Sequence, residues 1–277
     1  MTDQISHSGR YSLTDIGINL TDSVFDADRE TVIQDADTAG VKRMLITGTN
    51  ARESEQAISL CQQHPNRLFC TVGVHPHYSK EFSPEVRNTL AALLKHPHVC
   101  AVGETGLDFN RNFSTPEQQI WAFEQQLELA SESGLPLFLH ERDAHMQQIK
   151  MLRYVKDEIS GGVAHCFTGS REELYNYLDL DLYIGITGWI CDERRGVELF
   201  NLLKEIPANR LLLETDAPYL IPRNLKPKTK SRRNLPAYLP HILEQAALAR
   251  NDDPQELAQQ TEANCQRLFR FSQATLN

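Results

Sequence analysis

The sequence has no apolar run near the ~20 residues that a membrane-spanning helix requires. Its first ten residues, Met1 to Arg10, are polar and lack the apolar core of a signal peptide. None of its six cysteines forms a Cys-x-x-Cys pair, and several lie in apolar runs, where cysteine is typically a small buried group. We therefore expect a cytoplasmic protein without a membrane partner, whose cysteines are reduced and structural.

The chain also lacks an excess of positive charge. Its 28 lysines and arginines face 37 aspartates and glutamates, for a net charge of −9. This balance argues against a protein that coats nucleic acid, although it leaves room for a local basic patch. A glycine-rich turn is absent after the first predicted strand, where Thr21-Asp-Ser-Val-Phe25 follows. That absence disfavours a doubly wound dinucleotide-binding sheet.

Strand-like and helix-like patterns alternate along the whole chain. Eight apolar segments have the length and composition of strands: 13–20, 41–47, 68–74, 99–104, 135–140, 162–165, 182–186 and 211–215. Helical spacing separates them, so parallel pairing is expected. The length of 277 residues suits one (β/α)8 barrel, for which about 250 residues is typical. We predict an α/β fold of this TIM-barrel type, with a mobile polar extension at residues 1–11 and a single domain at 12–277.

Several predicted strands end in a metal-ligand type of side chain. Glu104, His140, His165 and Asp216 close the fourth, fifth, sixth and eighth strands. Barrel enzymes place their sites at these ends, so the four side chains are predicted to meet. A histidine at a strand end is most often a simple hydrogen-bonded group, and only the combination indicates a divalent metal bound through nitrogen and oxygen. Glu214 lies on the same strand face as Asp216 and is a candidate to assist it.

Three further features border the predicted site. His75 and His77, in His75-Pro-His77, follow the third strand, and we favour a substrate or phosphate contact over a rigid turn. Asp108 is suited equally to orienting a ligand and to capping a turn. The segment 223–233 has six basic residues and no acidic one. A solvated loop is the common explanation of such a run, but its position after Asp216 suits an anionic substrate.

These motifs resemble those of the TatD family of metal-dependent deoxyribonucleases. The resemblance covers about Thr14 to Phe271 and is carried by Gly73-Val-His-Pro-His77, Gly103-Glu-Thr-Gly-Leu-Asp108, Phe138-Leu-His140, His165-Cys-Phe-Thr-Gly169 and Glu214-Thr-Asp-Ala-Pro-Tyr219. It implies a barrel of the metallo-dependent hydrolase superfamily with Glu104, His140 and His165 as metal ligands and Asp216 as the strand-eight aspartate. It also implies Mg²⁺-dependent 3′→5′ exonuclease action on the 3′ ends of single-stranded DNA and RNA, with a role in DNA repair or degradation.

The sequence departs from this family at the first strand. Many members have a His-x-His pair there that holds a second metal, and this chain has Gly17 and Asn19. We therefore expect one well-held cation, with Glu104 and Asp216 as catalytic residues and Asp216 acting as the base. The cation is Mg²⁺ by resemblance, whereas histidine ligands favour Mn²⁺ or Zn²⁺. On the substrate side we place Asn19, His75, His77, Arg232 and Arg233, in a protein expected to be monomeric.

Other functions remain compatible with the same residues. An amidohydrolase-like enzyme acting on a small amide or ester would use the same barrel and ligands. Hydrolysis of an aminoacyl-tRNA ester is a related alternative that keeps a nucleic-acid substrate. A non-catalytic binding protein with a relict site is disfavoured by the retained Glu104, His140, His165 and Asp216.

Overall fold

The structure, a computed structural model, describes residues 10–229 and 231–271. Its eight strands form one parallel sheet in the order β1 to β8, and a bridge between Ile18 and Ala217 joins the first strand to the segment after the last. The strands are β1 (Leu13–Ile18), β2 (Val41–Ile46), β3 (Leu68–Val72), β4 (Val99–Asp108), β5 (Leu137–Arg142), β6 (Gly162–Ala164), β7 (Tyr183–Ile186) and β8 (Leu211–Leu213). The predicted (β/α)8 TIM barrel is confirmed.

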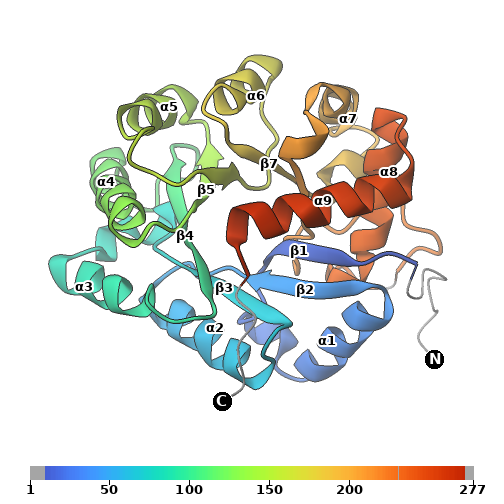
Figure 1. Ribbon diagram of the computed structural model, residues 1–277, viewed down its shortest axis with the longest axis horizontal. Coiled ribbons are helices and arrows are strands. Elements are labelled where there is room, and N and C mark those ends of the chain that lie inside the picture. Colours follow the sequence, from blue (N-terminus) through green and yellow to red (C-terminus); the bar gives the residue numbers. More distant parts are fainter. Residues whose placement is uncertain (1–9, 230, 272–277) are drawn as a thin grey trace.

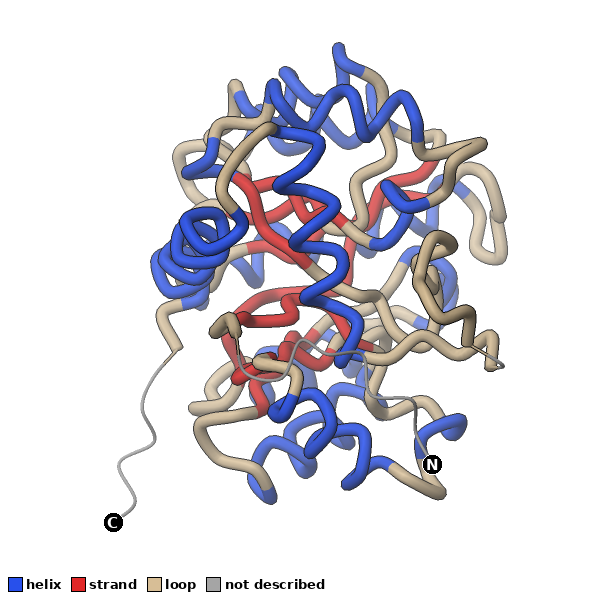
Figure 2. Tube along the Cα trace, turned by 90° about the vertical axis from the view of Figure 1, so that its right-hand side faces the viewer, coloured by secondary structure: helices blue, strands red, loops and turns tan. Residues whose placement is uncertain are grey.

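Helices surround this barrel (Figure 1), and a view turned by 90° shows the strands inside the helical shell (Figure 2). Each strand from β1 to β7 is followed by at least one helix, as a right-handed parallel crossover requires. The α-helices are α1 (Arg29–Thr38), α2 (Ala51–Gln63), α3 (Pro84–Leu93), α4 (Pro116–Ser133), α5 (His145–Tyr154), α6 (Arg171–Leu178), α7 (Val197–Leu202), α8 (Leu239–Arg250) and α9 (Pro254–Phe269).

Local sequence explains where several helices begin. Thr115 and Ser170 each form a capping box, with Gln118 and Glu173 as their partners, at the starts of α4 and α6. Such a box satisfies two backbone N–H groups that a helix otherwise leaves unpaired. Gly134 ends α4 in the left-handed conformation, which costs glycine little. These caps set the lengths of the βα connections that carry the site.

The barrel interior is filled with apolar side chains, and one end is closed by a helix. Side chains of the strands, including Ile16, Phe69 and Phe138, form one buried cluster with Leu268 and Phe269 of α9. Figure 1 shows α9 lying across the barrel. The opposite end, where the strands finish, is therefore the end left open for chemistry.

The observed strand β4 is longer than predicted. It runs to Asp108 rather than ending at Glu104, because β5 pairs with it as far as Asp108 and Arg142. Most of the predicted extension at residues 1–11 lies outside the described residues. Tyr11 is buried, and its hydroxyl donates to Glu244 across 3.3 Å.

The described part of the chain contains no disulfide and no helix that could cross a membrane. All six cysteines are free thiols, and all but Cys166 are buried. No helix among the described residues is both long enough and apolar enough to span a bilayer. The burial of these five cysteines agrees with a structural role, and the reduced state of the thiols stays a prediction.

Candidate active site

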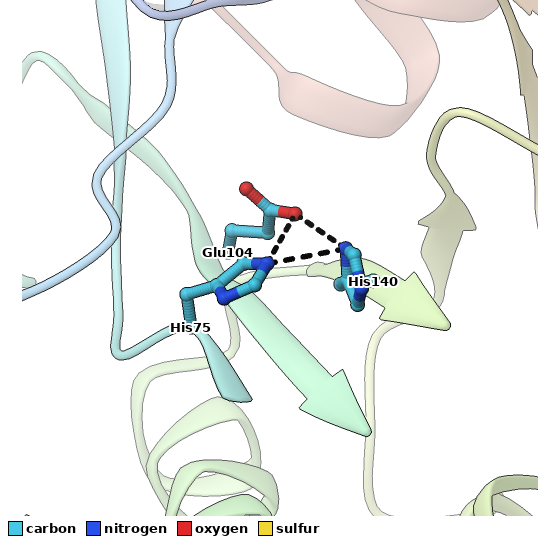
Figure 3. Close-up of side chains that lie close together, drawn as sticks. All are labelled: His75, Glu104 and His140. Carbon is cyan, nitrogen blue, oxygen red and sulfur yellow. Dashed lines mark hydrogen bonds and ion pairs between the residues drawn. The ribbon is translucent and has the colours of Figure 1, made fainter. Parts of the chain in front are cut away.

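Glu104 lies at the centre of a cluster of histidines at the open end of the barrel. Its Oε1 accepts hydrogen bonds from His140 Nδ1 at 2.9 Å and from His165 Nε2 at 3.0 Å. The Nε2 atom of His75 is 3.4 Å from the same oxygen (Figure 3). Ligand atoms of His75, Glu104 and His140 all lie within 4.8 Å of one another. Three imidazoles, from β5 and the segments after β3 and β6, thus converge on one oxygen of the β4 residue Glu104.

The charges of this cluster are set by mutual contact in a buried place. Burial alone would raise the pKa of Glu104, but the imidazoles of His75 and His165 hold it well below its usual range. Burial would likewise lower the pKa of His140 and His165, yet the neighbouring carboxylates raise both. His75 differs, because burial lowers its pKa to about 4 and leaves its imidazole neutral near pH 7.

The donor set fits a divalent cation. It combines one carboxylate with imidazoles, and Nε2 of His140 is buried without a hydrogen-bond partner. The raised pKa values of His140 and His165 mean that binding of a cation by these imidazoles would release protons. The cluster contains Glu104, His140 and His165 as the sequence predicted. His75, which we placed on the substrate side, lies among them.

Asp108 orients the cluster from the outside and also caps a turn. Its Oδ1 accepts from the backbone N–H groups of Asn110 and Arg111, and its Oδ2 accepts from His77 Nε2 at 2.8 Å. The same Oδ2 is 3.4 Å from His140 Nε2. Of the two roles that the sequence left open for Asp108, the turn cap is observed, and the orienting role has only the contact with His140 in its favour. His77 is one step removed from Glu104 and contacts the cluster through Asp108 and through the ring of His75, at 4.3 Å between centroids.

Asp216 follows β8 and faces the same cleft. Its Oδ1 accepts a hydrogen bond from Asn19 Nδ2 at 3.1 Å. Burial raises the pKa of Asp216 to about 7; the charge of His165 opposes this rise and those of Glu214 and Glu104 add to it. A carboxylate with such a pKa can both accept and release a proton near neutral pH.

Glu214 holds His165 in position from behind. Its Oε2 accepts from His165 Nδ1 at 3.0 Å, and its Oε1 accepts from the backbone N–H of Cys166. The Nε2 atom of His165 is thereby directed at Glu104, as carboxylates direct metal-binding histidines elsewhere. The side chain of Glu214 is fully buried, so it supports the site without reaching the cleft.

The glycine on β1 makes room for this carboxylate. A Cβ atom at Gly17 would lie 2.2 Å from Glu214 Oε2 and 3.3 Å from Glu214 Cδ. Any larger side chain at position 17, histidine included, therefore requires Glu214 to move. The residue at position 17 is thus coupled, through Glu214, to the hydrogen bond that supports His165.

Substituting Gly17 by alanine should disturb His165 through Glu214. We expect Gly17→Ala to lower kcat/KM by roughly 10- to 100-fold, the range typical of lost outer-shell support. The matched test is a double-mutant cycle with Glu214→Gln, followed by kinetics and circular dichroism. The double variant should lose much less than the product of the two single losses. A double variant whose loss in kcat/KM equals the product of the two single losses would refute this coupling.

The basic segment 223–233 contributes little to the cleft that the structure describes. The guanidinium of Arg233 pairs with both carboxylate oxygens of Asp28, at 2.9 and 2.6 Å, and lies over the ring of Phe25. Arg232 is exposed, and among the described residues none from this segment lines the cleft. The cleft has a volume of about 1680 Å³, and its arginines come from elsewhere: Arg29, Arg52, Arg111, Arg142 and Arg195.

A second group of possible ligands lies nearby, formed by Glu141, His145 and Glu173. Its histidine is bordered by other side chains: Asn176 Nδ2 faces His145 Nε2 at 3.2 Å, and Glu141 Oε2 is 3.6 Å from His145 Nδ1. This group is separate from the cluster around Glu104.

Comparison with known proteins agrees with this geometry. The profile of the family described as TatD related DNase matches residues 14–270. The chain belongs to this family. A relative from Erwinia tasmaniensis, named 3′-5′ ssDNA/RNA exonuclease TatD, is 57% identical over 255 residues, which cover 92% of this chain and 98% of the relative. A relative of the same name from Salmonella typhimurium is 55% identical with the same coverage.

Solved structures of the TatD family share the fold. A TatD homologue from Escherichia coli K12, YJJV, superposes with a TM-score of 0.85 at 27% identity, covering 93% of this chain and 98% of that one. A TatD family hydrolase from Entamoeba histolytica gives the same TM-score and identity, covering 95% and 99%. Molinate hydrolase, at 14% identity and a TM-score of 0.59, shares the barrel fold alone.

Proposed function

We propose that this protein is a metal-dependent 3′→5′ exonuclease that hydrolyses single-stranded DNA and RNA. The observation that carries the proposal is the single oxygen of Glu104, shared by His140 and His165 and bordered by His75, at the floor of a wide cleft. Relatives that match nearly their whole length bear the name of such an exonuclease. A role in DNA repair or degradation, a cytoplasmic location and a monomeric state belong to the same proposal.

The cation would be held by Glu104, His140 and His165, with His75 beside them and Asp216 across the cleft. When bound, it supplies the Lewis acidity that polarises a phosphoryl oxygen and activates water. The imidazole nitrogens favour Mn²⁺ or Zn²⁺, whereas the resemblance to the family implies Mg²⁺. Because His75 is neutral, its imidazole could bind a cation without first releasing a proton.

Asp216 serves as the proton acceptor for the attacking water. Its Oδ1 is held by Asn19, which leaves Oδ2 to take the proton as the water oxygen bonds to phosphorus. The bond from phosphorus to the 3′ oxygen of the preceding nucleotide then breaks, this oxygen takes a proton from solvent to become a hydroxyl, and a 5′-mononucleotide is released. Without a cation, burial raises the pKa of Asp216 to about 7; a bound cation would lower this pKa and keep the carboxylate ionised, ready to accept the proton. His77 and the cleft arginines would neutralise charge that develops on the phosphoryl group.

Removing the metal tests this proposal directly. We expect 5′-labelled single-stranded DNA and RNA to shorten stepwise from the 3′ end with Mg²⁺, Mn²⁺ or Zn²⁺, and cleavage to stop with EDTA and resume when metal is restored. Duplex oligonucleotides and aminoacyl-tRNA serve as parallel substrates. Failure to cleave any oligonucleotide, with hydrolysis of small amides or of the aminoacyl ester instead, would replace the exonuclease with one of those activities.

A further inference from the structure

Two large aromatic side chains that line the cleft are more than half exposed. Phe113 is 56% exposed and Tyr219 is 55% exposed, although most large apolar residues of this chain are buried. Both line the same cleft as Glu104 and Asp216. Leaving a phenylalanine ring in water forfeits part of the free energy of its burial, so its position at an active-site mouth suggests a ligand with an apolar face.

The rings stand on opposite sides of the catalytic cluster. Phe113 lies in the connection between β4 and α4, and Tyr219 lies in the segment that follows β8. Strands β4 and β8 are four positions apart in an eight-stranded barrel, so their ends face each other across the opening. A chain that crosses the cleft over Glu104 would pass between the two rings.

Both rings are anchored to residues of the site. Phe113 meets the ring of His77 edge-on, with 4.8 Å between centroids and an interplanar angle of 83°. The backbone N–H of Tyr219 donates to Asp216 O at 2.9 Å, and its hydroxyl donates to Asp22 Oδ2 at 3.4 Å. The rings are therefore held at defined distances from the catalytic residues while their faces stay exposed.

Positive charge accompanies the rings. Arg111 lies two positions before Phe113 on the same connection, and Arg52 lies at the start of α2; both line the cleft and both are exposed. In the described residues, neither guanidinium pairs with a carboxylate. Aromatic faces interleaved with cations form the usual surface for a flexible, unpaired strand, whose bases stack while its phosphates are neutralised.

We propose that Phe113 and Tyr219 are the two walls of a base-stacking subsite for the terminal nucleotides of a single strand. This inference rests on the proposed nuclease function, and it assigns the terminal bases of the substrate to the two aromatic side chains. Stacking tolerates any base because every base has a π-face. It also accounts for single strands, since bases in a duplex are already stacked and paired.

Steady-state kinetics can separate the contribution of the terminal base to binding from that of the sugar-phosphate backbone. Each variant is assayed on oligonucleotides of one sequence that end in either a normal 3′ nucleotide or an abasic one. Wild-type protein should prefer the normal end, and Phe113→Ala and Tyr219→Ala should each reduce that preference by about 5- to 150-fold, mainly through KM. Phe113→Trp and Tyr219→Phe keep an aromatic ring and should therefore keep the preference for a normal 3′ end.

A binding measurement without catalysis provides the second readout. With EDTA present, an oligonucleotide carrying 2-aminopurine at its 3′ end should be quenched by wild-type protein, because stacking quenches this base. The quenching should be lost in Phe113→Ala or Tyr219→Ala. Tyr154→Ala is the matched control, since Tyr154 is 87% exposed on α5 and does not line the described cleft.

The outcomes separate this proposal from the nuclease assignment. Metal-dependent cleavage by wild-type protein without any preference for a normal over an abasic end would overturn the subsite and leave the nuclease standing. Alanine variants that lose activity equally on both ends would show a structural role for the rings and also overturn it. If wild-type protein neither quenches the probe nor cleaves either oligonucleotide, both proposals fail together.

Discussion

Replacing Glu104 by glutamine is expected to lower kcat/KM for oligonucleotide hydrolysis by about 10³-fold. The amide keeps the shape of the side chain and removes its negative charge. His140 and His165 would lose the negative charge of their shared acceptor, and their raised pKa values depend in part on that charge. Divalent-metal affinity, measured by isothermal titration calorimetry, should fall with the rate.

Glu141→Gln is the matched control for this substitution. Glu141 lines the same cleft from the end of β5, and its carboxylate accepts from the backbone N–H of Ala144 rather than from the histidine cluster. Its rate should stay within a few-fold of the wild-type value, and circular dichroism should show both variants folded. A Glu104→Gln protein that kept wild-type metal affinity and rate would rule out Glu104 as the centre of the site.

The barrel and the core of the site could be predicted from the sequence for one physical reason. Parallel strands in a barrel all finish at one end, so polar residues that close apolar runs must lie near one another. Glu104, His140 and His165 needed no other information. Asp216 reaches the same cleft by the same rule, because β8 closes against β1 beside Asn19.

The sequence did not reveal the contacts of His75 and Arg233. Both residues lie in loops, and the position of a loop residue depends on the segments that pack beside it. His75 follows β3 in a proline-containing turn, and only the β3–β4–β5 order brings its ring beside Glu104 and His140. Arg233 lies in a basic run, but its partner Asp28 precedes α1, more than 200 residues away. Charge pattern alone cannot distinguish a guanidinium that binds Asp28 from one that faces the cleft.

A buried carboxylate on β1 gives the largest expected effect on stability. Asp15 is fully buried; its Oδ1 accepts from the backbone N–H groups of Thr215 and Gly17, and its Oδ2 from the Thr215 hydroxyl. Burial raises the pKa of Asp15 to about 7, against the effect of these hydrogen bonds. The folded protein thus holds a proton that the unfolded chain releases near pH 4.

The sign of the pH dependence follows from this difference. Between about pH 4 and pH 7 the folded state binds more protons at Asp15 than the unfolded state, so the free energy of unfolding falls as pH rises. Above pH 7 the loss is complete and amounts to up to about 4 kcal/mol, at 1.36 kcal/mol per pKa unit. The contribution of Asp15 is therefore largest at acidic pH.

Asp15→Asn should remove the loss of stability that wild type suffers as pH rises, while it keeps the hydrogen bonds of the side chain. The amide oxygen can accept from the two backbone N–H groups, and the amide NH₂ can donate to Thr215 Oγ1. Urea unfolding in EDTA at pH 5 and pH 8 should show the variant gaining stability over wild type at pH 8, with a gain less than half as large at pH 5. Asp157→Asn removes the same charge from an exposed site and should change neither value. An equal gain at both pH values would mean that the pKa of Asp15 is not raised, since only a group that titrates between them makes the gain depend on pH.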